Sequence, residues 1–131
     1  LESPMSVPCK NIYESPLSTV QHCHDGEQSI DMNRLFSDVD FKAPCHFIDY
    51  AVLSPNSSIG RHQHGNNEEI YLILEGSGCM TMDEHVFPVK AGDVIVNKAG
   101  GVHSLINDSN ACLKIFVVEI ECIKKNEASF Q

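Results

Sequence analysis

The segment Ser58–Gly76, SIGRHQHGNNEEIYLILEG, reads as a strand, a turn and a returning strand. Side chains two residues apart on a strand point to the same face of a sheet, so His62 and His64 face the same way. Glu69 opens the returning strand, which places its carboxylate beside the two imidazoles. The segment therefore predicts two neighbouring strands that direct two histidines and one glutamate toward a common point.

Short strands and tight turns continue on both sides of this segment. Residues 29–36 fit either a short strand or a helical turn. Strands of this length at short, even spacing are typical of an all-β sandwich or barrel rather than a βαβ fold. The expected strands are Phe47–Leu53, Ser58–His64, Glu69–Leu74, Cys79–Met82, Val86–Val89, Val94–Asn97, Val102–Ile106 and the long Ala111–Ile123.

Composition and length divide the chain into three parts within one domain. At 131 residues the chain has the length of a single domain. Residues 1–29 contain three prolines and no sustained periodicity, so we expect an irregular N-terminal arm there. Met5 is a candidate native start, which would make residues 1–4 vector-derived. Residues 30–123 are expected to form the barrel, and residues 124–131 a polar tail.

The charge balance and the cysteines limit the class of protein. Nine Lys and Arg oppose eighteen Asp and Glu, for a net charge of −9. Such a chain repels phosphate backbones and anionic lipid, so we expect neither a nucleic acid nor a membrane as partner. The six cysteines are scattered, which favours reduced thiols in a cytoplasmic protein. No apolar run approaches the roughly 18 residues of a membrane-spanning helix, and no signal peptide is recognisable.

His103 adds a third imidazole to the group. It stands at the start of a strand, directly after a glycine-rich turn. Three imidazoles and one carboxylate leave open positions on a metal that prefers five or six ligands, so water or substrate can also bind. We therefore predict one divalent metal ion per chain on His62, His64, Glu69 and His103.

The order and spacing of these residues resemble the two motifs of the cupin superfamily. The stretch from His62 to Gly76 resembles the first motif, and the stretch from Gly92 to Asn107 resembles the second. Asn56 and Lys98 stand where these motifs usually have Gly and Pro, and neither departure removes a ligand. The resemblance implies a small single-domain cupin (a monocupin) with a jelly-roll barrel. It also implies that the same four residues bind Fe, Zn, Mn or Ni.

Strand alternation predicts a mostly apolar pocket beside the metal, as is usual for a small ligand. Tyr71 shares the face of Glu69, and Leu105 shares the face of His103. On the last strand either Phe116 and Val118 or their neighbours Ile115 and Val117 should close the pocket. Lys98 lies in a turn near the expected barrel mouth, where it would meet a substrate carboxylate or remain solvated. The predicted substrate-binding residues are Tyr71, Leu105, Lys98 and Phe116.

The remaining histidines are interpreted as lying outside the metal site. His22 and His24 form a second His-x-His pair, but no carboxylate or third histidine follows at a matching spacing. An arm that crosses onto a partner subunit could nevertheless bring His24 near a neighbouring barrel mouth. Cupin barrels commonly pair, so the resemblance implies a two-fold homodimer. His46 and His85 fall at a strand edge and a turn, where we expect solvent exposure.

An open metal site can polarise and position a small metabolite or present it to dioxygen. Cupins with this ligand set include dioxygenases, decarboxylases, lyases and isomerases. The resemblance thus implies an enzyme for a small carboxylate- or amino-acid-like substrate, with oxygenase or lyase/isomerase chemistry, in a tailoring step of small-molecule biosynthesis. Two alternatives stay open: a cupin partner in hydrazine formation from an N-hydroxylated amino acid, and a non-catalytic metabolite- or metal-sensing cupin. No catalytic residue beyond the metal-bound water or substrate is identified.

Overall fold

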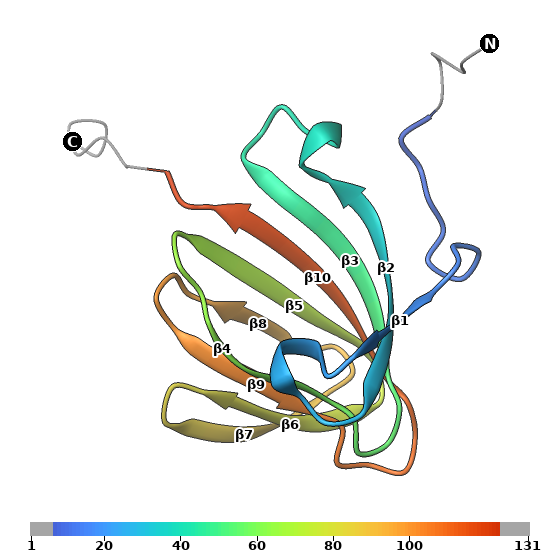
Figure 1. The fold of residues 1–131 in the computed structure, drawn as a ribbon, viewed down its shortest axis with the longest axis vertical. Coiled ribbons are helices and arrows are strands. Elements are labelled where there is room, and N and C mark those ends of the chain that lie inside the picture. Colours follow the sequence, from blue (N-terminus) through green and yellow to red (C-terminus); the bar gives the residue numbers. More distant parts are fainter. Residues whose placement is uncertain (1–6, 124–131) are drawn as a thin grey trace.

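Figure 1 shows the protein as a computed structural model that describes residues 7–123. The described chain is nearly all β, which confirms the expected fold class. The predictions for residues 1–4 and for the tail 124–131 lie outside the described residues. The strands are β1 (Ser18–Gln21), β2 (Ser29–Ser37), β3 (Cys45–Leu53), β4 (Ser58–Gln63), β5 (Asn67–Glu75), β6 (Ser77–Met82), β7 (His85–Lys90), β8 (Val94–Asn97), β9 (Val102–Ile106) and β10 (Leu113–Glu121), and the 3-10 helices are η1 (Cys23–Asp25) and η2 (Asp38–Asp40).

The strands form two antiparallel sheets (Figure 1). The larger sheet has the order β1-β2-β3-β10-β5-β8, and the smaller has the order β4-β9-β6-β7. Strands that are neighbours in space are often distant in sequence, as β10 between β3 and β5 shows. This arrangement is consistent with the jelly roll that the resemblance implied, and it is one of the two-sheet forms that the strand pattern predicted.

The hydrophobic core lies between the two sheets and is built by strand alternation. On β10, for example, every second residue from Leu113 to Val117 is buried, while Phe116 and Val118 on the other face are only partly covered. Each fully buried Leu or Ile contributes roughly 1.5–3 kcal/mol relative to an exposed one. The core residues are Ile30, Ala51, Leu53, Ile59, Tyr71, Ile73, Met80, Val89, Ile95, Leu105, Leu113, Ile115 and Val117.

The N-terminal arm contains regular structure that ties it to the barrel. β1 pairs with β2, and β2 resolves the sequence ambiguity at residues 29–36 in favour of a strand. η1 packs against β4, because two glycines allow the backbones to meet there. A Cβ atom on Gly60 would lie 2.0 Å from the carbonyl oxygen of His24, and one on Gly26 would lie 2.2 Å from that of Ser58. The arm thus crosses the barrel of its own chain (Figure 1).

Two further expectations can be compared with the described residues. All six cysteines lie within them and form no disulfide bond with one another. None of the helices in the described part of the chain is long and apolar enough to span a membrane.

Candidate metal centre

Four potential ligands converge on one point inside the barrel. β4 and β9 pair so that His62 lies opposite His103, His64 follows directly after β4, and Glu69 projects from β5. The Nε2 atom of His103 lies 2.8 Å from that of His62 and 3.3 Å from that of His64. The four ligand atoms all lie within 4.8 Å of one another. The structure therefore brings together the four residues selected from the sequence.

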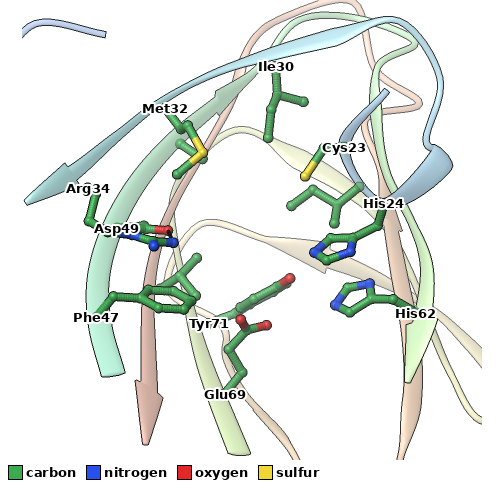
Figure 2. A pocket seen from close by; sticks show the side chains of 13 residues that line it. Cys23, His24, Ile30, Met32, Arg34, Phe47, Asp49, His62, Glu69 and Tyr71 are labelled. Atoms are coloured by element: carbon green, nitrogen blue, oxygen red, sulfur yellow. Dashed lines mark hydrogen bonds and ion pairs between the residues drawn. The ribbon is translucent and has the colours of Figure 1, made fainter. Parts of the chain in front are cut away.

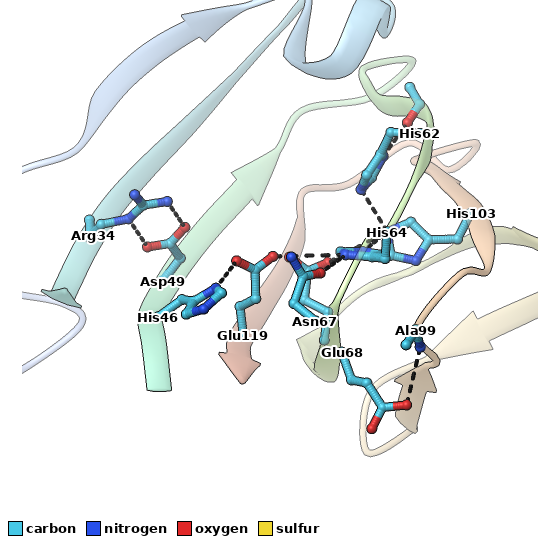
Figure 3. Close-up of polar contacts among 12 residues, drawn as sticks. Arg34, His46, Asp49, His62, His64, Asn67, Glu68, Ala99, His103 and Glu119 are labelled. Carbon is cyan, nitrogen blue, oxygen red and sulfur yellow. Dashed lines mark hydrogen bonds and ion pairs between the residues drawn. The ribbon is translucent and has the colours of Figure 1, made fainter. Parts of the chain in front are cut away.

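Hydrogen bonds orient two of these imidazoles. The Nδ1 atom of His62 lies 2.8 Å from the carbonyl oxygen of Gly60, and that of His64 lies 2.6 Å from the side-chain oxygen of Asn67 (Figure 3). Because both oxygens accept, each Nδ1 carries the proton and each Nε2 presents a lone pair to the centre. Histidine ligands of metals are usually held in this way.

Burial at the centre disfavours the charged forms of its side chains when no cation is present. Oε1 of Glu69 lies 3.3 Å from Nε2 of His64 and 3.5 Å from Nε2 of His103, and it has no hydrogen-bond partner among the described residues. Burial, together with the nearby Glu119, raises the pKa of Glu69 to about 8. Burial and the neighbouring imidazoles lower the pKa of His103 to about 3. Neutral imidazoles and an unpartnered carboxylate oxygen are the donors that a divalent cation would satisfy.

The donor set also indicates the kind of cation. Imidazole suits Zn, Fe, Ni and Cu, whereas Ca and Mg prefer all-oxygen sites. Three nitrogens and one oxygen from the protein leave positions open for water or a ligand on a five- or six-coordinate ion. The residues present thus fit a transition-metal centre of the open kind.

Metal binding is expected to release a proton from Glu69. With a pKa of about 8, this carboxyl is mostly protonated at pH 7, and a bound cation requires its ionised form. We expect about one proton released per ion at pH 7, and a metal affinity that falls as the pH drops below about 8. Calorimetry in buffers with different ionisation enthalpies measures this proton. Glu69→Gln should release none from this site, and a wild-type protein that released none would contradict the assignment.

A carboxylate that the sequence analysis missed supports the centre from β10. Oε1 of Glu119 lies 3.8 Å from Nδ1 of His64, and its Oε2 atom pairs with Nδ1 of His46 at 3.0 Å (Figure 3). His46 was expected to be exposed, but it is partly buried, and the hydrogen bond that its ring donates to Glu119 raises its pKa. His46, Glu119 and His64 therefore form a polar row that leads from the surface to the centre.

An unexpected histidine covers the centre. The ring of His24, on η1, stacks on the ring of His62 with a centroid distance of 3.8 Å and an interplanar angle of 11° (Figure 2). His22, His24, Asp25 and Gln28 all adopt positive φ, which is uncommon for residues other than glycine. The arm thus brings His24 to the site of its own chain, whereas the sequence suggested a neighbouring subunit.

Two neighbouring spaces adjoin the centre and share lining residues. The inner cavity, of about 120 Å³, is lined partly by core residues (Figure 2), and the outer hollow, of about 330 Å³, is lined partly by the exposed Gln63 and Gly65. Apolar side chains such as Ile30, Met32 and Val117 line much of the inner cavity. The residues that line both spaces are His24, Arg34, Phe47, His62 and Glu69.

The four predicted substrate-binding residues lie in different surroundings, and only one of them lines the inner cavity. Tyr71 is buried and lines the inner cavity. Leu105 is part of the core, and Lys98 is exposed beside a separate small cavity of about 40 Å³ next to His103. The predicted position of Phe116 is corrected. Its side chain lies on the outer face of β10, and the neighbouring Val117 lines the inner cavity instead.

A two-sheet barrel with an interior His3Glu centre defines the class of protein, and comparison with known proteins names the family. The sequence profile of the cupin domain matches residues 49–119. An oxalate-binding protein of Thermotoga maritima is 32% identical over 101 residues, which make up 77% of this chain and 84% of the relative. The chain belongs to the cupin family.

Solved structures agree with this assignment. A crystal structure from Thermotoga maritima, described as a predicted oxalate decarboxylase, has a TM-score of 0.81 and 30% identity, and the match covers 83% of this chain and 95% of that one. The cupin domain of Schizosaccharomyces pombe Cnp3 has a TM-score of 0.70 at 14% identity, with 85% and 72% covered. The second match shows a shared fold alone.

Proposed function

We propose that this cupin is a metal-dependent enzyme that acts on a small carboxylate, with oxalate as the first candidate. The observation that carries the proposal is the convergence of three Nε2 atoms and the unpartnered Oε1 of Glu69 on one point. The names of the Thermotoga maritima relatives support oxalate as the first compound to test. The finer alternatives of oxygenase and lyase chemistry are separated by experiment below.

The residues of the chain have distinct tasks in this proposal. His62, His64, Glu69 and His103 hold the ion, which would act as a Lewis acid on a ligand oxygen. The inner cavity of about 120 Å³ is far smaller than the roughly 300–1,000 Å³ of sites for drug-sized ligands, so it suits a compound of a few carbons. Its apolar lining limits the water around the ligand, which strengthens charge interactions.

The test combines binding and turnover on the protein loaded with Mn, Fe, Ni or Zn in turn. We expect oxalate binding that requires the ion, and formation of formate and carbon dioxide when the carbon–carbon bond of protonated oxalate breaks. Oxygen consumption would favour an oxygenase instead, whereas turnover under anaerobic conditions would favour a lyase. If no metal-loaded form binds oxalate or another small carboxylate, the proposal is wrong.

Binding without turnover is the second candidate, since one relative is named for oxalate binding alone. In that case the ion and the cavity serve to capture or sense the carboxylate. Saturable, metal-dependent oxalate binding with no product formed under air or without oxygen would support this function over the enzyme.

We also propose that the barrel forms a homodimer. The edge strand β8 exposes Val94 and Val96 on the larger sheet, and Val86 on β7 is exposed as well. Exposed apolar residues near a sheet edge favour pairing with a second copy. Sizing by light scattering should give about twice the 14.5 kDa mass of the chain. A monomer at high protein concentration would contradict the dimer.

A further inference from the structure

We infer that Arg34 is a second anchor of the ligand site and selects compounds with a second carboxylate. One carboxylate would bind at the metal centre, and the other would meet the guanidinium of Arg34. The inference rests on the proposed function, because it assumes that a carboxylate binds at the centre. It adds the side chain that recognises the second carboxylate, which oxalate and its longer homologues have and a monocarboxylate lacks.

Arg34 is held rigidly at the edge of the inner cavity. Its Nε and Nη2 atoms donate to Oδ1 and Oδ2 of Asp49 at 3.0 and 3.1 Å (Figure 3), and its Cζ atom lies 4.0 Å from the centre of the Phe47 ring. These two bonds use two of the five N–H groups of a guanidinium, so three remain for a ligand. The side chain of Arg34 is 50% exposed, whereas that of Asp49 is 9% exposed.

The position of this ion pair is unusual for a structural role. Arg34 follows Ile30 and Met32 on the inward face of β2, and Asp49 precedes Ala51 on the inward face of β3. Because Arg34 is half exposed, water screens its attraction to Asp49, and the burial of the Asp49 carboxylate offsets part of what remains. The pair therefore contributes little net stability to the fold. The guanidinium is therefore better explained by what it binds.

The geometry of the cavities connects Arg34 to the metal centre. Arg34 lines both the inner cavity and the outer hollow, as do His62 and Glu69. Figure 2 shows these three side chains around the inner cavity. Among the described residues that line these two spaces, Arg34 is the only lysine or arginine. A carboxylate bound beside His62 and Glu69 thus has one cationic side chain within the same small space. Guanidinium groups match carboxylates with two parallel hydrogen bonds.

The expected contribution of Arg34 is directional hydrogen bonding rather than net charge, because Asp49 balances its charge. A lysine at this position would retain the charge but lose the planar fork. Arg34→Lys should therefore behave more like Arg34→Met than like the wild type. The behaviour of Arg34→Lys thus distinguishes two roles of Arg34: recognition through directed hydrogen bonds, and attraction through positive charge alone.

The test is calorimetry on the metal-loaded protein with two matched pairs of probes: malonate and acetate, and succinate and propionate. For Arg34→Met we expect affinity for at least one dicarboxylate to fall by about tenfold or more. Affinity for the monocarboxylates should change less than about twofold, and metal content should stay the same. Arg34→Lys, which can still pair with Asp49, serves as the second variant if Arg34→Met does not fold.

Several outcomes would overturn the inference, and they differ from failure of the proposed function. Unchanged dicarboxylate affinity in both variants, or an equal loss for both members of each pair, would exclude Arg34 as the selective anchor. A loss caused by Lys98→Met instead would assign recognition to the turn beside His103. If the metal-loaded wild type binds oxalate but none of the four probes, this inference fails while the proposed function stands. If it binds neither oxalate nor any of the four probes, the proposed carboxylate function fails as well.

Discussion

His103→Ala is expected to abolish metal binding. His103 is almost completely buried, and its Nε2 atom lies within 3.5 Å of ligand atoms on His62, His64 and Glu69, so no other side chain can replace it. Loss of residues that only orient metal ligands typically costs 10–100-fold in affinity, and loss of a ligand should cost more than about 100-fold. Titration with a competing chelator measures the affinity, and metal-dependent oxalate binding should be lost in parallel.

The matched control is His85→Ala, which removes an exposed histidine at the start of β7. It should retain full metal affinity. Circular dichroism of His103→Ala establishes that the β-structure is intact, and His62→Ala at a less buried position provides a second test. Wild-type metal affinity in a folded His103→Ala variant would refute the assignment of this ligand.

The second large effect is expected from one methyl group at Gly60. A Cβ atom there would lie 2.0 Å from the carbonyl oxygen of His24 and 2.6 Å from the amide nitrogen of Gly26. Backbone atoms cannot yield as a flexible side chain can, so η1 must move away from β4. Gly60→Ala should therefore destabilise the fold by about 1–3 kcal/mol. It should also separate the stacked rings of His24 and His62 and open the cavity to water.

Gly65→Ala is the control for Gly60→Ala, because a Cβ atom at Gly65 would meet no described atom within 4 Å. Chemical denaturation of both variants gives the difference in the free energy of unfolding. Exchange of water at a bound paramagnetic ion such as Mn²⁺ reports on the cover over the centre. Equal stability of the two variants, with the same water access, would show that η1 does not need its close contact with β4.

The four proposed ligands could be predicted because their placement depends on local rules. His62 and His64 share a face through strand alternation, and a short turn brings Glu69 beside them. The same alternation turns the neighbouring Glu68 away from the centre, where its Oε2 atom accepts a hydrogen bond of 3.1 Å from the backbone amide of Ala99. Alternation and turn length are both readable from one sequence.

Phe116 was misplaced because alternation gives no direction where both faces of a strand are apolar. On β10 the inward Ile115 and Val117 alternate with outward Phe116 and Val118, and all four are hydrophobic. The position of Glu119 inside the barrel, by contrast, could have been predicted from the sequence. It continues the inward series at a spacing of two, so a charged residue at that point indicates a polar environment inside the barrel.

Arg34 and His24 could not be predicted because their positions depend on contacts between distant parts of the chain. Arg34 lies on β2, which was ambiguous in the sequence, and its partner Asp49 is fifteen residues away on β3. His24 reaches the centre only because the arm crosses β4 at Gly60. Neither relation follows from a local pattern.

The central claim is that these four side chains bind one divalent ion, and metal analysis by mass spectrometry tests it most directly. The protein is purified without a metal-affinity column, incubated separately with Mn, Fe, Ni and Zn, and freed of excess ion. We expect about one ion per chain for at least one metal, and almost none in a His62→Ala, His64→Ala double variant that retains its β-structure. Retention of no metal by the wild type, or equal retention by the double variant, would contradict the claim.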